Sequence, residues 1–343
     1  MPKDSYMGGV ATMVNDYIEN DALFSEKGFD VSLFDYQTKS NNKIVYYFKQ
    51  RTALKRRVKC NGIDYVHIHT SRNSVFLKDV LLARYIKKKT KKPVIFTVHV
   101  GDISTVFEKI PAVLKKRILR IINKYVDKIV FLSKAIQRQF INCGFDEEST
   151  IVLYNFHKNE PRLFPAYDTK LNLLFVGMIN RDKGIIELLS AICGFSGEDV
   201  HLDVCGTITD DSIKDAFAGL VEENEDKVTL NGYVTGEKKQ RVFEKADVLI
   251  LPSYHEGMPL VILEALSYGC AIIATPVGAI PEILTESNYA QVDVKSSDGI
   301  KDEITRFLSD PDAVERMKKE NFELAKHFTI NTHVEQLAAF IRK

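Results

Sequence analysis

Two glutamates stand in one short stretch of the chain whose residue types suit a ligand site. The stretch runs from Pro252 to Leu266, and seven residues separate its Glu256 from its Glu264. An apolar run ends just before the stretch, a loop with a glycine follows, and Pro259 takes an early position in an apolar helix. The sequence therefore predicts a strand, a loop and a helix that begins close to both carboxylates.

The beginning of this helix is expected to bind an anion. The backbone N–H groups of Met258, Leu260 and Val261 would lack acceptors in the first turn and lie at the positive end of the helix dipole. This arrangement suits a diphosphate. Glu264, one turn further along, is placed to accept hydrogen bonds from ribose hydroxyls, and Glu256 in the loop is within reach of a sugar. We therefore expect the two carboxylates to have separate tasks.

Lys183 is a candidate cation for the same anion. It stands at a turn between an apolar run and a helical segment, with Arg181 close before it. Where no metal ion neutralises the charge that grows on a leaving diphosphate, a cation must do so. Taken alone, the residue fits a surface lysine at a strand-to-helix turn better, so its assignment depends on the residues around it.

Three segments of the second half together resemble the retaining family 4 glycosyltransferases of GT-B fold. The segment 256–265 resembles the E-x7-E motif of this family, 174–184 resembles its phosphate-binding segment, and 269–282 resembles its conserved tail. The resemblance implies an enzyme that moves a hexosyl group from a nucleotide sugar, UDP- or GDP-linked, to a saccharide or lipid-linked acceptor. It further implies retention at the anomeric carbon, no required metal and no cofactor.

The resemblance also implies roles for single residues. Gly177, Arg181 and Lys183 would lie at the diphosphate, and Glu264 at the ribose. The remaining donor-binding residues are expected in the loop and at the helix start: Gly257, Met258, Pro259, Leu260 and Val261. The family usually has an arginine directly after the glycine that corresponds to Gly177, and this chain has Met178 there. Whether Arg181 takes the place of that arginine is left open.

Two segments of the first half resemble the family as well. The segment 97–102 resembles the family's His-Gly segment, whose histidine contacts the donor sugar, although Val100 separates His99 from the glycine. His99 is therefore expected to join Glu256 and Lys183 as a catalytic residue. Gly8 and Gly9, which open a helix, resemble the family's glycine loop at the acceptor and the diphosphate, where glycines let the backbone approach a ligand closely.

These residues need parallel sheets to position them, and the chain has the required alternation of strand-length apolar runs with helical segments. Strands are predicted at 31–36, 65–69, 94–99, 128–132 and 150–154, and then at 171–177, 201–205, 228–231, 248–251, 271–274 and 289–292. Helices are predicted at 75–88, 113–124, 184–193, 236–244 and 259–268. The fold class is α/β, with two doubly wound, Rossmann-like domains that face a cleft.

The domain boundary is expected in the segment 157–169, which has two prolines and no periodicity. The first domain, the acceptor side, would comprise residues 1–157, and the nucleotide-sugar domain residues 158–330, while a last helix at 331–343 is expected to pack back on the first domain. Only the polar residues 1–7 precede Gly8, where the family has a buried strand. The first domain is thus expected to lack its first strand, and we favour a start codon assigned too late.

Charge is distributed unevenly between the two halves. Residues 1–160 carry 28 basic and 16 acidic side chains, and the rest carry 19 and 30. The basic runs at 87–92 and 115–120 favour either an anionic membrane surface as partner or solvated helix faces. Nucleic acid is disfavoured, because no helix-turn-helix spacing, zinc finger or RNA-recognition aromatic motif accompanies the charge.

The five cysteines are scattered and include no C-x-x-C pair, which argues against a disulfide framework and a structural zinc site. His67 and His69 alternate on one strand face, but no third metal ligand is evident, and strand packing is the expected role. No signal peptide or spanning segment is evident. We expect a cytoplasmic protein, and peripheral attachment at the inner face of the membrane is left open.

Two other function classes remain open. A nucleotide-sugar 2-epimerase of the same fold would bind the same donor without an acceptor. A non-catalytic module that binds nucleotide sugar or membrane is the second alternative, because of the missing strand and Met178. A nicotinamide dehydrogenase is disfavoured, since no G-x-G-x-x-G follows a strand in either half.

Overall fold

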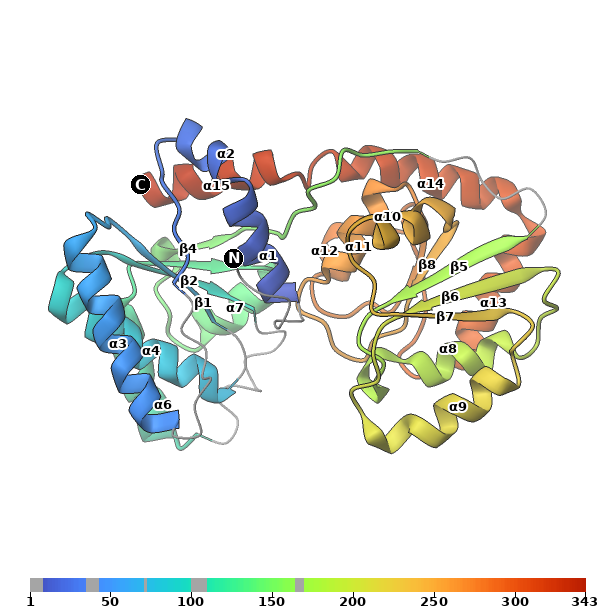
Figure 1. Cartoon of the computed structure of the whole chain (residues 1–343), viewed down its shortest axis with the longest axis horizontal. Helices are drawn as coiled ribbons and strands as arrows, with labels where there is room; N and C mark the ends of the chain where they lie inside the picture. Colours follow the sequence, from blue (N-terminus) through green and yellow to red (C-terminus); the bar gives the residue numbers. More distant parts are fainter. Residues whose placement is uncertain (1–8, 35–42, 71–72, 100–109, 164–169) are drawn as a thin grey trace. The chain divides into compact units, whose positions relative to one another are not determined.

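A computed structural model describes residues 9–34, 43–70, 73–99, 110–163 and 170–343 of the chain. The chain divides into two compact units (Figure 1). The first comprises Met1–Tyr154 together with His333–Lys343, and the second comprises Asn155–Thr332. Each unit is built on a sheet whose strand pairs are all parallel.

The first unit has a four-stranded sheet of order β1-β2-β3-β4. Its strands are β1 (Val66–Thr70), β2 (Val94–Val98), β3 (Lys128–Phe131) and β4 (Thr150–Val152). Its helices are α1 (Gly9–Glu19), α2 (Asp21–Glu26), α3 (Lys43–Cys60), α4 (Asn73–Thr90), α6 (Ala112–Tyr125), α7 (Lys134–Asn142) and most of α15 (Ile330–Arg342), with a 3-10 turn, η1 (Glu147–Ser149). Helices α1, α2 and α15 cover one face of the sheet, and α3, α4 and α6 cover the other (Figure 1).

The burial of the strands explains these two layers. All five residues of β2 are buried, as expected of a central strand covered on both faces. In β1 the burial alternates, so that Val66 and Ile68 enter the apolar core beside α3, α4, α6 and α7, whereas His67 and His69 belong to the opposite face. The two histidines therefore lie on the side of the sheet that α1 and α15 cover.

One strand prediction for the first unit is wrong. Residues 31–34, the described part of the expected strand at 31–36, form no strand, and no strand precedes β1 in the described ranges 9–34 and 43–65. Phe34 packs against the core from this irregular segment, and the guanidinium of Arg57 lies 6.0 Å from its ring. The alternation of apolar residues that predicted a strand therefore belongs to a loop. Packing of a side chain on the core explains an apolar residue without any strand pairing.

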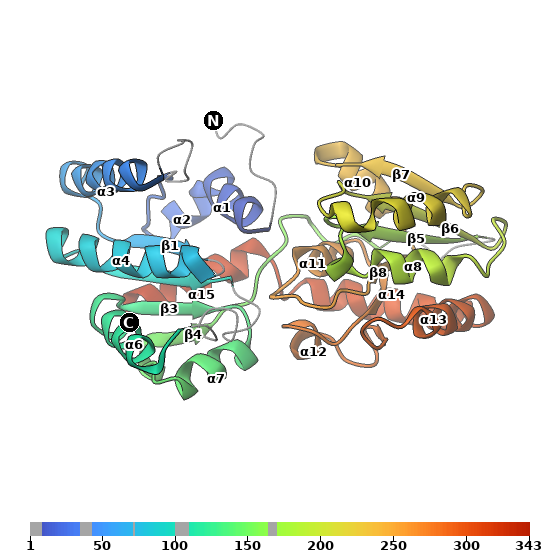
Figure 2. The ribbon, with the colours of Figure 1, turned by 90° about the horizontal axis from the view of Figure 1, so that it is seen from below.

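The second unit has a six-stranded sheet of order β10-β9-β8-β5-β6-β7. Its strands are β5 (Leu171–Val176), β6 (Val200–Cys205), β7 (Val228–Gly232), β8 (Val248–Leu251), β9 (Ala271–Ala274) and β10 (Ala290–Gln291). Its helices are α8 (Ile185–Ile192), α9 (Lys214–Glu222), α10 (Gly236–Lys245), α11 (Leu260–Ser267), α12 (Ile280–Ile283), α13 (Ser297–Ser309) and α14 (Pro311–Ala325), with 3-10 turns η2 (Arg181–Lys183) and η3 (Asp211–Ile213). Helices α8, α9 and α13 cover one face, and α10, α11 and α14 cover the other (Figures 1 and 2).

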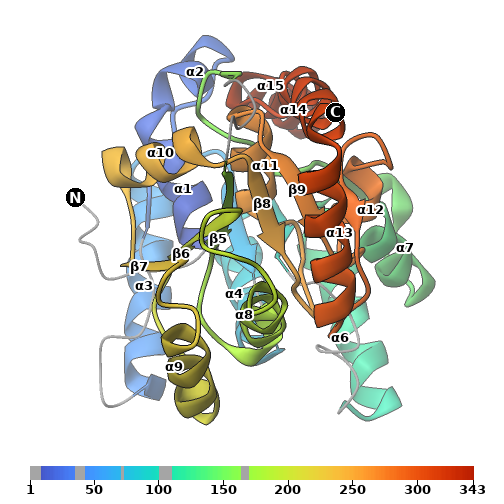
Figure 3. The same cartoon turned by 90° about the vertical axis from the view of Figure 1, so that its right-hand side faces the viewer.

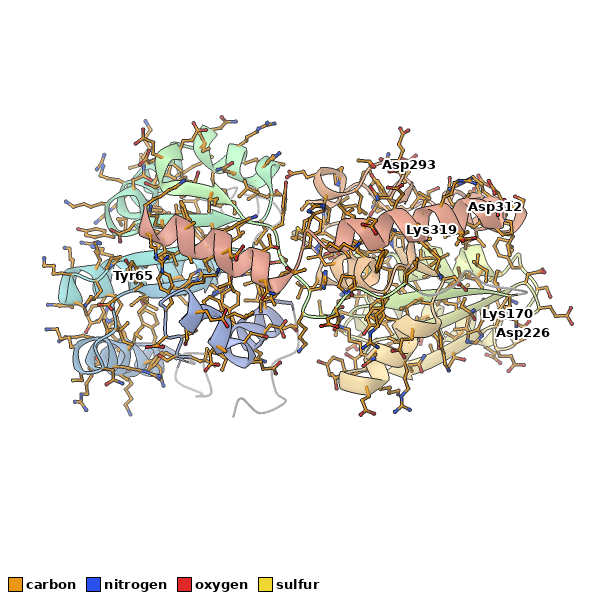
Figure 4. The ribbon with its side chains drawn as sticks, turned by 90° about the horizontal axis from the view of Figure 1, so that it is seen from above. Tyr65, Lys170, Asp226, Asp293, Asp312 and Lys319 are labelled. Atoms are coloured by element: carbon orange, nitrogen blue, oxygen red, sulfur yellow. The ribbon has the colours of Figure 1, made fainter. Side chains whose placement is uncertain are left out.

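The two ends of this sheet have different surroundings. Lys170 and Asp226, which precede β5 and β7, both lie at the amino ends of the strands (Figure 4). The loops with the predicted ligand residues follow the carboxyl ends of β5 and β8. Strands β8 and β9 are buried along their whole length, so the sheet gives these loops a rigid base.

Asn155 to Leu163, in which the sequence places the beginning of the linker, form neither helix nor strand. His157 is nevertheless buried, and its Nε2 lies 2.8 Å from the carbonyl oxygen of Ala325. This segment is therefore packed on α14 within the second unit. In the described part of the chain, no helix combines the length and the hydrophobicity that crossing a bilayer requires.

A close backbone approach joins the carboxyl ends of β5 and β6. The N–H of Gly177 donates to the carbonyl of Cys205 over 3.0 Å, and Gly206 follows directly in β6's exit loop. A Cβ on Gly206 would stand 1.9 Å from the carbonyl oxygen of Gly177. Only glycine fits at this position, and the approach fixes the loop that carries Lys183.

We predict that Gly206→Ala lowers the free energy of unfolding by about 1–3 kcal/mol, the usual cost of overpacking. Urea unfolding followed by circular dichroism measures the change. Gly219→Ala is the matched control, because Gly219 lies inside α9 with no atom near the added methyl group. This control should gain about 0.5–1 kcal/mol from the helix preference of alanine. Equal stability of the two variants would contradict the steric role of Gly206.

Candidate active site

The strand order of the second unit defines a topological switch point. From β5 the chain continues to β6 and β7 on one side, while β8, β9 and β10 extend the sheet on the other side. Strands β5 and β8 are therefore neighbours, although they are far apart in the sequence (Figure 3). Ligands of doubly wound sheets bind beyond the carboxyl ends of the strands at such a point.

A lysine and a glutamate from these two loops meet at the switch point. Lys183 ends η2 after β5, and Glu256 lies in the loop after β8. The Nζ of Lys183 lies 2.5 Å from Oε1 of Glu256, and the Oγ of Ser253 donates to the same oxygen over 2.8 Å. The side chains are only 20% and 9% exposed, so the pair is largely shielded from water. The structure thus brings together two of the three predicted catalytic residues.

The loop of Glu256 is fastened to both neighbouring loops. The N–H of Tyr254 donates to the carbonyl of Asp182 over 2.8 Å, and the hydroxyl of Thr275 donates to the carbonyl of Ser253 over 2.5 Å. On the other side, the N–H of Ala279 donates to the carbonyl of Gly257 over 2.7 Å. The backbone around the carboxylate is therefore held in place before any ligand binds.

Two glycines permit this close packing of loops. Gly184 has a φ of +66°, and a Cβ there would stand 2.1 Å from the carbonyl oxygen of Pro252. Gly278 has a φ of +62°, and its Cβ would stand 2.4 Å from the carbonyl oxygens of Glu256 and Gly257. Both positions need glycine for the backbone angle and for the space. Both glycines belong to segments that the sequence had singled out, without a role for either residue.

Glu264 forms a second lysine–glutamate pair. It lies on α11, and its Oε1 is 2.5 Å from the Nζ of Lys239 on α10. The two side chains are 19% and 28% exposed. Sequence reasoning missed Lys239, because no spacing rule connects residues that far apart on two helices. Hydrogen bonds to Oε2 of Glu256 or Glu264 are absent from the described residues, so each pair leaves one carboxylate oxygen for a ligand.

The beginning of α11 has the predicted form. Pro259 stands just before Leu260, the first helical residue, and no side chain of the described residues caps this end. The first N–H groups of a helix have no acceptor within the helix. Met258 is buried, and its carbonyl accepts a hydrogen bond from Nδ2 of Asn155 over 2.9 Å. Sequence reasoning missed Asn155, which fixes the chain where the helix begins.

Two further predicted residues, Gly177 and Arg181, lie in the segment after β5 that also carries Lys183, while Gly257 and Val261 lie in the loop after β8 and in α11. Gly177 directly follows β5, and Met178 is 44% exposed. Arg181 opens η2, and its N–H lies 3.4 Å from a carboxylate oxygen of Asp210. Its side chain is exposed and forms no ion pair with any described residue. Arg181 and Lys183 therefore occupy one short turn, but only Lys183 contacts Glu256.

In the first unit, His99 belongs to a cluster of aromatic side chains beside α1 and α15, in which Tyr17 and His333 are buried and the other histidines are partly buried. Its Nε2 lies 3.1 Å from Nδ1 of His69, and the rings of His67 and His69 are 4.3 Å apart. The hydroxyl of Tyr17 on α1 lies 2.5 Å from Nε2 of His333 on α15. Gly9 begins α1 and is exposed, whereas Gly8 lies outside the described residues.

Burial keeps these histidines neutral. It lowers the pKa of His67 to about 3 and that of His99 to about 4, with a further contribution from neighbouring histidines. The pKa of His333 falls to about 4 for the same reason, and that of His69 falls well below its usual range. In the described part of the chain, no three His, Cys, Asp or Glu side chains are placed to share a metal ion. The ring of His69 lies 4.3 Å from that of His67 and 5.7 Å from that of Tyr17, and Nε2 of His67 lies 2.7 Å from the hydroxyl of Thr97.

Comparison with known families covers most of the chain. Residues 20–157 match the family described as Glycosyltransferase Family 4, and residues 157–324 match the family described as Glycosyl transferases group 1. A 41.2 kDa protein of the cps region of Klebsiella pneumoniae is 26% identical over 310 residues, which cover 82% of each chain. TuaC of Bacillus subtilis, named as a candidate teichuronic acid biosynthesis glycosyltransferase, is 27% identical over 66% of this chain and 57% of its own.

Solved structures show the same architecture. HepE of Anabaena, crystallised with UDP, superposes with a TM-score of 0.76 at 15% identity, over 98% of this chain and 96% of HepE. The lipopolysaccharide outer core galactosyltransferase WaaB superposes with a TM-score of 0.69 at 18% identity, over 98% and 97%. At these identities the similarity concerns the fold, which is GT-B with two Rossmann-like domains.

We predict that acid destabilises the first unit more than the second. The unfolded histidines take up protons below about pH 6.5, whereas the folded ones resist protonation to about pH 4, so stability falls as the pH falls through this window. Hydrogen exchange with mass spectrometry at pH 7.5 and pH 5, corrected for the intrinsic rates, measures it. Protection should fall in β1, β2 and α15 and persist in β5 and β8. An equal loss in both sheets would contradict the role of the histidines.

Proposed function

We propose that this chain, which belongs to glycosyltransferase family 4, transfers a hexosyl group from a UDP- or GDP-sugar to a saccharide or lipid-linked acceptor, with retention and without a required metal. The observation that carries the proposal is the pair Lys183–Glu256 at the switch point, next to the pair Lys239–Glu264. The family membership establishes a glycosyltransferase, and the two pairs support the assignment of the donor site.

Lys183 and the beginning of α11 would bind the diphosphate. An ammonium group has three donors, and Glu256 takes one of those of Lys183. Two donors remain for phosphate oxygens, while the first N–H groups of α11 supply a helix dipole of the correct sign. The negative charge that grows as the sugar leaves would thus be stabilised by groups that are already in place.

The two carboxylates would contact the two ends of the donor, the ribose and the transferred sugar. Oε2 of Glu264 would accept hydrogen bonds from the ribose hydroxyls, with Lys239 holding the other oxygen. Oε2 of Glu256 would accept a hydrogen bond from a hydroxyl of the transferred sugar, with Lys183 and Ser253 holding Oε1. His99 would contact the same sugar from the first unit, as the family resemblance implies.

Retention is proposed to occur by departure and attack on one face of the sugar. The bond from the anomeric carbon to the diphosphate oxygen breaks, and the acceptor hydroxyl forms its bond from the same side while a diphosphate oxygen takes its proton. Double displacement would instead require a carboxylate nucleophile. Glu256, the candidate for that role, has its Oε1 held by Lys183 and Ser253, and we propose that its Oε2 contacts a sugar hydroxyl instead.

The setting is proposed to be the cytoplasm and the assembly of a cell-surface polysaccharide. Two relatives support the second point, since one is named for a cps region and the other for teichuronic acid biosynthesis. HepE was also crystallised with UDP-glucose, which favours UDP over GDP. The described cysteines are all free, in agreement with a reducing compartment.

We predict that a UDP-sugar raises the melting temperature of the chain, and that Lys183→Ala removes most of this shift. Loss of a charge-assisted hydrogen bond of about 1.5–3 kcal/mol corresponds to a Kd about ten- to hundredfold higher. Glu264→Ala should weaken binding in the same way. A thermal-shift titration with UDP-, GDP-, TDP- and ADP-sugars measures the effect.

The matched control is Lys319→Ala, which removes the same charge from the exposed face of α14 (Figure 4). It should bind the donor like the unsubstituted chain. Glu256→Gln should keep binding and lower turnover, since its contact is to the transferred sugar. Equal donor affinity of the Lys183 and Lys319 variants would show that the loop after β5 does not bind the donor.

We predict that the product of an α-linked donor is an α-glycoside. The coupling constant of the anomeric proton, measured by NMR within the first turnovers, gives the configuration. A β-glycoside would exclude same-face transfer. Conversion of the nucleotide sugar itself, with no acceptor consumed, would instead identify a 2-epimerase.

A further inference from the structure

Helix α6 carries an exposed apolar tip at its amino end. Val113 is 83% exposed, the largest value among the large apolar residues that the structure describes, and Leu114 is 46% exposed. Pro111 and Ala112, directly before them, are exposed as well. Single exposed apolar residues are ordinary on protein surfaces, but four in a row at one helix end form a patch.

A basic stripe continues from this tip along the same helix. Arg117, Arg120 and Lys124 follow Val113 at spacings of four, three and four residues, which places them on one face. All three are exposed, and they form no ion pair with any residue in the described ranges. Buried Ile118 and Ile122 anchor the opposite face in the core, so the helix presents this stripe to the outside.

The stripe borders a hollow of about 540 Å³. The hollow is lined by Lys116, Leu119, Arg120, Asn123 and Lys124 of α6 and by Cys143 and Gly144 after α7. Three of these side chains are cationic and none is a carboxylate. Nδ2 of Asn123 donates to the carbonyl of Gly144 over 2.8 Å and holds the two walls together. Its cationic donors suit a phosphate group.

Helix α4 extends the positive surface. The ring of Tyr125, the last residue of α6, has the guanidinium of Arg84 at 5.8 Å and the ammonium groups of Lys88 and Lys124 at 5.6 and 5.8 Å. Helices α4 and α6 pack against each other. Three cations thus gather around one aromatic ring, and none of the three forms an ion pair with another residue in the described ranges; the nearby Asp127 pairs with Lys87. The field of this surface favours an anionic partner.

We propose that this α6 face, defined as Val113, Leu114, Lys116, Arg117, Arg120 and Lys124, docks the protein on an anionic phospholipid bilayer. The apolar tip would enter the interfacial region, the basic stripe would lie at the headgroups, and one headgroup phosphate would occupy the hollow. A helix with a charged face and exposed apolar residues is suited to a membrane interface. The apolar tip is what favours a bilayer over a nucleic acid, whose backbone offers charge but no apolar phase.

This inference goes beyond donor binding and does not depend on it. The α6 face belongs to the first unit, and the proposed diphosphate and ribose contacts belong to the second. Docking would confine the enzyme to the surface where a lipid-linked acceptor resides. It would also explain why the excess of basic side chains is concentrated in the first half of the chain.

The test is co-sedimentation of the full chain with vesicles of phosphatidylcholine alone or mixed with phosphatidylglycerol. We expect binding to the anionic vesicles only, and a loss of at least tenfold in apparent affinity for Arg117→Glu with Arg120→Glu. The matched control is Arg56→Glu with Lys59→Glu, which makes the same charge change at exposed positions of α3. The control should lose less than twofold.

A second variant, Val113→Ser with Leu114→Ser, isolates the apolar tip. It should reduce binding at low and at high salt alike, because salt screens interactions between exposed charges beyond a Debye length of about 8 Å at physiological ionic strength and leaves apolar insertion unaffected. Circular dichroism and the donor-induced thermal shift should be unchanged in all variants, which separates a failed docking surface from a failed donor site.

Three results would overturn the inference. Equal losses for the α6 and α3 charge variants would show that only diffuse charge matters. Equal binding to both kinds of vesicle would remove the role of the anionic headgroup. Binding of single-stranded DNA through Arg117 and Arg120, with no binding to vesicles, would assign the face to a nucleic acid.

Discussion

The contact between Lys183 and Glu256 is the interaction on which the proposed site depends. It joins the exit loops of β5 and β8, which are neighbours only because the sheet changes direction between these strands. Gly184 and the N–H of Tyr254 hold these two loops in contact. Gly278, the N–H of Ala279 and the hydroxyl of Thr275 fasten the loop after β8 to the loop after β9. A cation and a carboxylate at hydrogen-bond distance are thereby fixed at the sheet edge where ligands of this fold bind. Such preorganisation limits the rearrangement that donor binding requires.

Local sequence patterns predicted most of the strands and helices. Continuous apolar runs located β2, β8 and β9, and the loop, proline and apolar run after Leu251 located the beginning of α11. The expected strand at 31–36 failed, because an alternating pattern also describes a loop that packs apolar side chains on a core. Periodicity indicates which side chains are buried. It does not show whether a segment pairs as a strand, because the partner strand lies elsewhere in the chain.

Residue patterns alone located candidate site residues mainly where these lie close together in the sequence. Glu256, Glu264 and the helix start belong to one motif, and the family resemblance added Lys183. Lys239 and Asn155 contact this motif from other elements, so no spacing pointed to them. The same holds for the cluster of His99, which α1 and α15 complete from the two ends of the chain. Tertiary contacts of this kind follow from topology.

The most direct test of the donor site is a crystal structure of the full chain with UDP. The account predicts that the diphosphate contacts Nζ of Lys183 and the first N–H groups of α11, and that the ribose hydroxyls lie at Oε2 of Glu264. Both lysine–glutamate pairs should persist, with the nucleotide added to them. A nucleotide bound away from the loops after β5 and β8, or bound there without contact to Lys183 and Glu264, would contradict it.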